Sequence, residues 1–148
     1  MKRSFLALFL VYPLLLIAGD HDHKSVTKEV LAQTDSSWDG NRLPAYPEEP
    51  PFISVVKFTI PPESRLPWHE HPMINVGYLI SGELTVVKED GSEIELQAGD
   101  ALVEVVDAWH FGRNDGNVPT EIVVVYAGVE GQPLAIVRPE TNEGEDSK

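Results

Sequence analysis

The sequence contains no cysteine among its 148 residues. The chain can therefore form no disulfide, and it offers neither a thiol nucleophile nor a cysteine for lipid attachment. At this length a single domain can bury a hydrophobic core that is large enough to be stable without such cross-links.

Basic residues are scarce: 11 lysines and arginines stand against 24 aspartates and glutamates, which gives a formal net charge of −13. A surface of this sign repels polyanions, so we exclude nucleic acids and anionic membrane surfaces as partners. Part of the acidity lies at the C-terminus, where residues 139–148 are typical of a solvated, disordered tail.

Long apolar runs are absent except at residues 5–17, which follow Lys2 and Arg3 and precede small residues. This layout is typical of a secretory signal peptide. The run is shorter than the roughly 20 residues that a membrane-spanning helix needs, and Pro13 interrupts it. We expect residues 1–19 to be a cleaved leader and the protein to be periplasmic or secreted, without stable membrane association. An uncleaved leader that anchors the protein in the membrane is the alternative.

The sequence shows no helical periodicity beyond Phe52. Residues 20–51 are polar and rich in proline, which predicts an arm or linker, with a short strand at residues 28–34. Residues 52–138 contain short apolar runs separated by turn residues, which predicts an all-β sandwich or barrel domain. The predicted strands are Phe52–Ile60, Ile74–Ile80, Glu83–Lys88, Glu93–Leu96, Ala101–Val106, Glu121–Tyr126 and Leu134–Val137. Ser81-Gly82 and Asp90-Gly91 predict two-residue hairpin turns.

Two of these runs, residues 74–80 and 122–126, are apolar at successive positions rather than at alternate ones. Side chains alternate between the faces of a strand, so both faces of these strands are apolar. One face can line the interior of the barrel, and the other needs a second sheet or a second subunit. The pattern predicts a homodimer.

Two histidines, His69 and His71, flank a single glutamate, and His110 follows about forty residues later. Positions i and i+2 of a strand point to the same face, so both imidazoles are expected in one small volume. Imidazole is a common ligand of divalent transition metals. A third histidine from another strand would leave coordination positions open for a substrate, so the pattern predicts a site for iron, zinc, copper, nickel or manganese.

The spacing of these residues resembles that of the cupin superfamily. Its first motif is similar to His69-x-His71-x3-Asn75-x6-Gly82, and its second to Gly99-x10-His110-x3-Asn114. The resemblance extends over about residues 52–126. It implies a double-stranded β-helix, that is, a jelly-roll barrel, which is usually dimeric. It also implies a metal site at His69, His71 and His110.

Three positions depart from the cupin pattern. Asn75 stands where the family usually has a glutamate ligand, and Val105 and Asp107 stand where it usually has proline and glycine. Asp107 tolerates a left-handed backbone better than most residues, so the turn can survive. A carboxamide supplies only a neutral oxygen, and Asn75 is therefore either a weak ligand or a hydrogen-bonding neighbour of the site. Cupins with three histidine ligands include diketone- and thiol-cleaving dioxygenases, so this resemblance still implies metal chemistry.

Strand parity assigns further residues to the two faces. Gly77 and Leu79 share the parity of Asn75 and are expected to line an apolar substrate pocket with it. Trp68, Trp109 and Tyr78 are expected to point away from the metal.

Glu104 interrupts an apolar strand, and we predict it as a general base or an alternative metal ligand. The competing interpretation is a glutamate that faces solvent or pairs with Arg113 or Arg65. Asn114 is expected to be a turn residue rather than a ligand.

These observations favour a metal-dependent oxidoreductase of dioxygenase type that acts on a small enolisable, phenolic or thiol compound. Such compounds lose a proton on binding and would supply the negative charge that Asn75 does not. The alternative is a non-catalytic module that binds or senses a small molecule in the exported space, and a lyase or isomerase without redox chemistry is a third reading. The fold by itself does not choose among these functions.

Overall fold

The computed structural model describes residues 25–139, and in this part of the chain all regular secondary structure is β-strand. The strands are β1 (Phe52–Ile60), β2 (Ser64–Arg65), β3 (His69–Glu70), β4 (Ile74–Ser81), β5 (Glu83–Lys88), β6 (Glu93–Gln97), β7 (Ala101–Val103), β8 (His110–Asn114), β9 (Thr120–Gly128) and β10 (Ile136–Val137). Within residues 25–139 there is accordingly no helix long and apolar enough to cross a membrane. The predicted leader (1–19) and most of the predicted tail lie outside the described residues.

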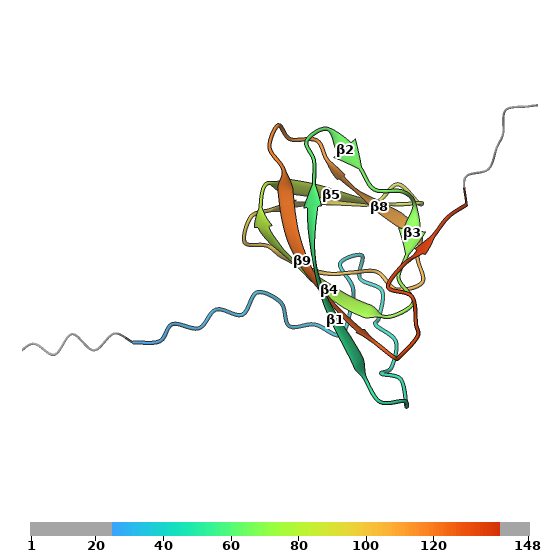
Figure 1. The fold of residues 1–148 in the computed structure, drawn as a ribbon. Coiled ribbons are helices and arrows are strands. Elements are labelled where there is room, and N and C mark those ends of the chain that lie inside the picture. Colours follow the sequence, from blue (N-terminus) through green and yellow to red (C-terminus); the bar gives the residue numbers. More distant parts are fainter. Residues whose placement is uncertain (1–24, 140–148) are drawn as a thin grey trace, which may run out of the picture.

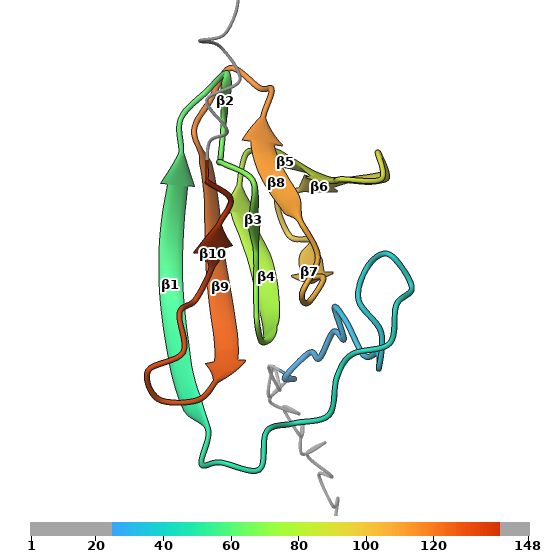
Figure 2. The ribbon, with the colours of Figure 1, turned by 90° about the vertical axis from the view of Figure 1, so that its right-hand side faces the viewer.

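The strands form two antiparallel sheets that face each other (Figures 1 and 2). One sheet has the order β1-β9-β4-β7, and the other has the order β10-β3-β8-β5-β6, with β2 also paired to β8. The chain crosses between the sheets after β1, β3, β4, β6, β7, β8 and β9. Strands that are neighbours in a sheet are therefore mostly distant in sequence, which is the arrangement of the predicted jelly-roll barrel.

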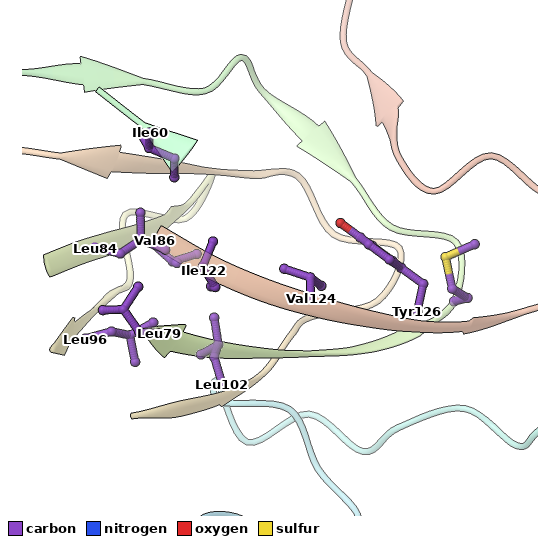
Figure 3. Packing of buried hydrophobic residues seen from close by; sticks show 10 residues of the cluster. Ile60, Leu79, Leu84, Val86, Leu96, Leu102, Ile122, Val124 and Tyr126 are labelled. Carbon is purple, nitrogen blue, oxygen red and sulfur yellow. The ribbon is translucent and has the colours of Figure 1, made fainter. Parts of the chain in front are cut away.

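The core lies between the sheets because alternate residues of each strand point inward. Figure 3 shows the close packing of buried aliphatic side chains from both layers toward one end of the interior. They include Leu79 of β4, Leu84 and Val86 of β5, and Leu102 of β7, each at most 5% exposed. This packing fixes the strands that carry the polar residues of the interior.

The apolar runs predicted the longer strands well, but two predicted strands are shorter in the structure and one is absent. The predicted strand 101–106 ends at Val103, and the predicted strand 134–137 is reduced to its last two residues. Residues 28–34 form no strand, so that prediction was wrong. The apolar runs did not reveal β2, β3 and β8, which are short or polar and owe their strand conformation to pairing with neighbours, although the histidine spacing had placed His69 and His110 on strands.

The two predicted hairpins had different outcomes. Asp90-Gly91 does join β5 and β6, which pair as antiparallel neighbours. Ser81-Gly82 does not form a hairpin, because β4 pairs with β7 and β9 whereas β5 belongs to the opposite sheet. Gly82 has a positive φ of 77°, and a Cβ there would lie 2.7 Å from Thr120 Oγ1. The glycine therefore allows a sharp turn between sheets against the start of β9.

The segment before β1 is irregular but is attached to the barrel. The Trp38 amide donates a hydrogen bond to the Val103 carbonyl at the end of β7, with a length of 3.0 Å. Asp39 forms a 2.7 Å ion pair with Lys88 at the end of β5, and both side chains are largely buried. Burial raises the pKa of Asp39, but its hydrogen bonds, first of all that from Lys88, hold the pKa below its usual value. This loop is therefore part of the folded domain.

The outer face of the β1-β9-β4-β7 sheet remains partly exposed and apolar. It carries Ile53 and Val55 of β1, Val125 of β9, and Tyr78 and Ile80 of β4, and these side chains are between 40% and 66% exposed. The outward direction predicted for Tyr78 agrees with this placement.

Candidate metal centre

The three histidines predicted as ligands meet inside the barrel. His69 lies on β3 and is the cross-strand partner of His110 at the start of β8, and His71 follows just after β3. The ring centroids of the three imidazoles are 4.4–5.1 Å apart. One nitrogen from each ring lies within 4.8 Å of the others. The i, i+2 spacing and the pairing of two strands together produce this cluster.

Backbone carbonyl groups fix the orientation of each imidazole. The Nδ1 atoms of His69, His71 and His110 lie 2.8, 2.7 and 2.8 Å from the carbonyl oxygens of residues 67, 134 and 108. A carbonyl oxygen can only accept, so each Nδ1 carries the proton and each Nε2 keeps its lone pair. His110 Nε2 is buried and has no hydrogen-bond partner. This unpartnered nitrogen is therefore available to coordinate a metal ion.

The protonation state also suits metal binding. Burial lowers the pKa of all three imidazoles, and that of His71 falls to about 4. The carbonyl contacts oppose this effect only in part, and the neighbouring histidines lower the pKa of His69 and His71 further. The three rings are therefore neutral at pH 7, which is the form that binds a metal.

Asn75 lies on β4 beside this cluster and is only 1% exposed. Its Oδ1 atom is buried without a hydrogen-bond partner, and its Nδ2 donates a long 3.4 Å bond to the Met73 carbonyl. An unpartnered buried oxygen is costly unless another group contacts it. This geometry is consistent with either role expected for Asn75, as a weak ligand or as a hydrogen-bonding neighbour.

Glu104 faces the same cluster from the residue after β7. Its Oε2 atom lies 3.6 Å from His110 Nε2, and burial raises the pKa of the carboxyl group to about 7. The interpretation as a solvent-facing or arginine-paired glutamate was wrong. Arg113 pairs with Glu93 and Asp115, and the Arg65 guanidinium lies over the Phe111 ring.

Tyr126 is a site residue that the sequence analysis missed. It is the cross-strand partner of Asn75, and its ring centroid lies 5.5 Å from that of His71. Figure 3 shows its hydroxyl group pointing away from β9 into the interior. Burial and the nearby Glu104 raise the pKa of Tyr126 to about 12, so the phenol is a hydrogen-bond donor at pH 7. Its shared parity with Ile122 and Val124 was the signal that could have placed it inside.

Comparison with known families agrees with this arrangement. The family model for the cupin domain matches residues 56–126. The chain is a member of the cupin superfamily. A search of curated protein sequences returned no significant match.

Solved structures show the same fold. The cupin resembles an uncharacterised double-stranded β-helix protein from Klebsiella pneumoniae, with a TM-score of 0.52 and 22% identity over 65% of this chain and 90% of that one. It also resembles an oxalate decarboxylase from Lactobacillus farciminis, with a TM-score of 0.50 and 26% identity over 57% of this chain and 26% of that one. A DMSP lyase from Ruegeria pomeroyi has a TM-score of 0.51 and 19% identity over 57% of this chain and 42% of that one. The cupin thus spans most of the first protein and less than half of the other two.

A cavity of about 230 Å³ opens next to the histidines of this cupin. Asn75, Gly77, Glu104 and Tyr126 line it together with the three histidines, and most of the remaining wall is aliphatic. Leu79 has the predicted parity but does not line the cavity, because it lies further along β4 in the packed core. The cavity is smaller than the roughly 300–1,000 Å³ typical of sites for drug-sized ligands, so it suits a small compound.

Neither Trp68 nor Trp109 lines this cavity, in agreement with the outward direction expected for them. The Arg138 guanidinium lies over both indole rings, at 5.4 Å from the Trp68 ring and 4.5 Å from the Trp109 ring. Trp68 also packs edge-on against Phe111. The tryptophans therefore support the histidine-bearing strands from outside.

The donor set of the cupin fits a divalent transition metal. Three neutral imidazoles, oriented through Nδ1, present Nε2 atoms to one another, and an amide oxygen and a carboxylate oxygen lie beside them. Nitrogen donors with one or two oxygens suit iron, zinc, copper, nickel and manganese. His69, His71 and His110 would hold the ion, and the hydrogen bonds at Nδ1 would keep their rings in place.

Proposed function

We propose that this cupin binds a divalent transition metal through His69, His71 and His110 and is a dioxygenase-type oxidoreductase. Its substrate would be a small enolisable, phenolic or thiol compound. The observation that supports this proposal most directly is the fixed tautomer of the three buried, neutral imidazoles. Their Nε2 lone pairs converge beside a cavity that a small molecule can enter.

The protein groups around the cavity favour a small anion with an apolar body. Three neutral histidines bring no negative charge to a divalent ion, which when bound would favour the ionised form of a coordinating substrate. The Tyr126 hydroxyl can donate a hydrogen bond to an anionic oxygen, while Ile122 and Val124 can contact carbon atoms. The oxalate decarboxylase relative was crystallised with formate, which supports the idea that a barrel of this shape can admit a small anion.

Metal content is the first test of this proposal. Mass spectrometry of the untagged protein is expected to detect near-stoichiometric metal, which a His69→Ala/His110→Ala variant loses. The metal-loaded protein is then screened for oxygen uptake with a β-diketone, a catechol and a small thiol. Bound metal without oxygen uptake in any class would argue for the alternative, a binding or sensing module. Absence of metal after reconstitution would refute the metal centre itself.

We also propose that residues 1–19 direct export and that the protein is periplasmic or secreted. The support for this is the arrangement of charge and hydrophobicity at the N-terminus. Mass spectrometry of the protein recovered from its host would show the loss of the leader if it is cleaved. An intact N-terminus in the membrane fraction would favour the anchored alternative.

A homodimer through the outer face of the β1-β9-β4-β7 sheet is a further part of the proposal. Val55 on β1 and Val125 on β9 are cross-strand partners on this face, and they are 66% and 40% exposed. Contiguous apolar side chains on a sheet favour association. Light scattering should give the mass of a dimer for the wild type and of a monomer for Val55→Glu/Val125→Glu. A wild-type monomer at micromolar concentration would contradict the proposal.

A further inference from the structure

Glu104 is a buried carboxyl group with no basic partner in the described part of the chain. It is 9% exposed and contributes to the wall of the cavity that holds the histidines. Its Oε2 atom lies 3.6 Å from Nε2 of His110, which is neutral and supplies no positive charge. An ionised carboxylate buried away from a positive charge costs several kcal/mol. The position therefore favours a cation next to this oxygen.

The backbone places Glu104 directly opposite Asn75. β4 and β7 pair in antiparallel register through Val76–Val103 and Gly77–Leu102, and the next pair in this register is Asn75 and Glu104. The Glu104 amide donates a 3.1 Å hydrogen bond to the Asn75 carbonyl. A carboxylate is thus absent at position 75 and present at the cross-strand position beside it.

We propose that Glu104 is a direct ligand of the metal and completes a site of three imidazoles and one carboxylate. This inference rests on the metal centre of the proposed function. Two ligand atoms that share one tetrahedral ion with bonds of ~2.1 Å lie ~3.4 Å apart. The 3.6 Å between Glu104 Oε2 and His110 Nε2 is close to that separation, so little movement of this pair is needed. Of the two roles predicted for Glu104, general base or alternative metal ligand, this geometry favours the ligand.

Trp38 holds the carboxyl group from the side of the N-terminal segment. Its indole lies beside Glu104, and its Nε1 atom is buried without a fully formed hydrogen bond. The backbone bond from Trp38 to Val103 and the ion pair of Asp39 with Lys88 fix the indole there. Trp38 is thus a positioning residue, whose N–H can donate to the carboxylate once a metal holds it.

The ligand set narrows the class of substrate. A divalent ion with three neutral imidazoles and one carboxylate has a net charge of +1. A singly charged anion then neutralises the centre, whereas a dianion would leave excess negative charge in a largely aliphatic cavity. Phenolates, enolates and thiolates of small monoacidic compounds fit this requirement.

The test compares metal binding by the wild type and by Glu104→Gln. Each metal-free protein is titrated with Co²⁺ alone, and the affinity is measured by competition with a chromophoric chelator. We expect the affinity to fall at least about 100-fold, since the loss of groups that only orient ligands already costs about 10–100-fold. The visible absorption of bound Co²⁺ should also change, because the coordination shell loses one charged oxygen. Glu95→Gln, which changes an exposed glutamate on β6, is the matched control and should retain wild-type values.

Two further variants separate ligation from damage to the fold. Asn75→Glu/Glu104→Gln moves the carboxylate back to β4 and should restore at least about a tenth of the affinity, since both positions border the same cluster. Trp38→Phe keeps an aromatic ring but removes the indole N–H, so it should shift the Co²⁺ spectrum and lower the affinity about 10-fold while the protein still unfolds cooperatively.

The outcomes distinguish this inference from the function on which it rests. If the wild type binds Co²⁺ and folded Glu104→Gln matches its affinity and spectrum, Glu104 is not a ligand, while the three-histidine centre stands. If the wild type binds no Co²⁺, the metal centre fails and the ligand assignment fails with it. Loss of affinity in Glu104→Gln with recovery in the double variant supports the assignment.

Discussion

Two asparagines at opposite ends of the barrel interior show how structural and functional polar groups differ. Asn114 ends β8, and the strand places it about 13 Å from His110 at the other end. Its Nδ2 donates to the carbonyl oxygens of Ile60, Pro61 and Val118, and its Oδ1 accepts from the Gly116 amide. Asn114 is thus fully bonded and joins several loops.

Asn75 is buried to almost the same degree as Asn114, at 1% against 0% exposed, but its bonding is incomplete. Its Oδ1 has no partner, and the nearby His110 Nε2 has none either. Satisfied buried groups stabilise a fold, whereas unsatisfied ones that converge on a cavity cost stability and can bind a ligand. The comparison therefore favours the Asn75 end as the candidate site and identifies the Asn114 end as structural support.

The largest effect is expected when Asn114 and Asn75 are each replaced by alanine in separate variants. Asn114→Ala leaves three carbonyl groups and one amide without their partner, so the free energy of unfolding should fall by about 3 kcal/mol or more. Asn75→Ala removes an oxygen that has no partner, and the loss should stay below about 1 kcal/mol. Urea unfolding of the metal-free proteins measures both values. Equal losses would abolish the distinction between the two ends.

A smaller effect on stability is expected when the pH is lowered, and it should arise at the end of the barrel that holds the three histidines. His71 has a pKa of about 4 in the folded protein against 6.5 in the unfolded chain, so the unfolded state binds more protons between these values. The stability of the metal-free protein should therefore decrease as the pH falls from about 6.5 toward 4, and the lowered pKa values of His69 and His110 act in the same direction.

Glu104 acts in the opposite direction. Its pKa is raised from 4.5 to about 7, so its contribution is complete below pH 4.5 and is lost as the pH rises through 7. It offsets most of the contribution of His71, so the net change between pH 6.5 and 5 is set by the lowered pKa values of His69 and His110, and we expect the stability to decrease. Urea unfolding at several pH values checks this. Glu104→Gln should steepen the loss, whereas a variant with no change in the profile would show that the carboxyl is not perturbed.

The smallest effect concerns two hydroxyl groups, one at each end. The Thr120 hydroxyl donates to the Glu83 carbonyl, so Thr120→Val should cost about 1 kcal/mol of stability. The Tyr126 hydroxyl points into the cavity, so Tyr126→Phe should change the stability by less than about 0.5 kcal/mol. Thermal unfolding resolves the difference, and a larger loss for Tyr126→Phe would mean that its hydroxyl has a structural partner.

The sequence predicted the faces of the long strands better than the connections between them. Period-two alternation correctly placed Gly77 and Asn75 on the inner face, and Asp107 adopts the predicted left-handed conformation, with φ of 52°. Alternation gives the face of a side chain but not its depth, which is why Leu79 was expected in the cavity and lies in the core instead. The direction of the chain after Gly82 was also wrong, because a turn signal does not specify which sheet the next strand joins.

The sequence by itself determined the all-β class, the family, the inward faces of the long strands and the three histidines, because each follows from local periodicity or from motif spacing. Only the tertiary structure decided that Glu104 lies opposite Asn75, that Tyr126 faces the histidines and that Trp38 reaches the carboxyl group. These contacts join residues from distant parts of the chain. Their positions depend on strand register and on the packing of two sheets, which no short window of sequence specifies.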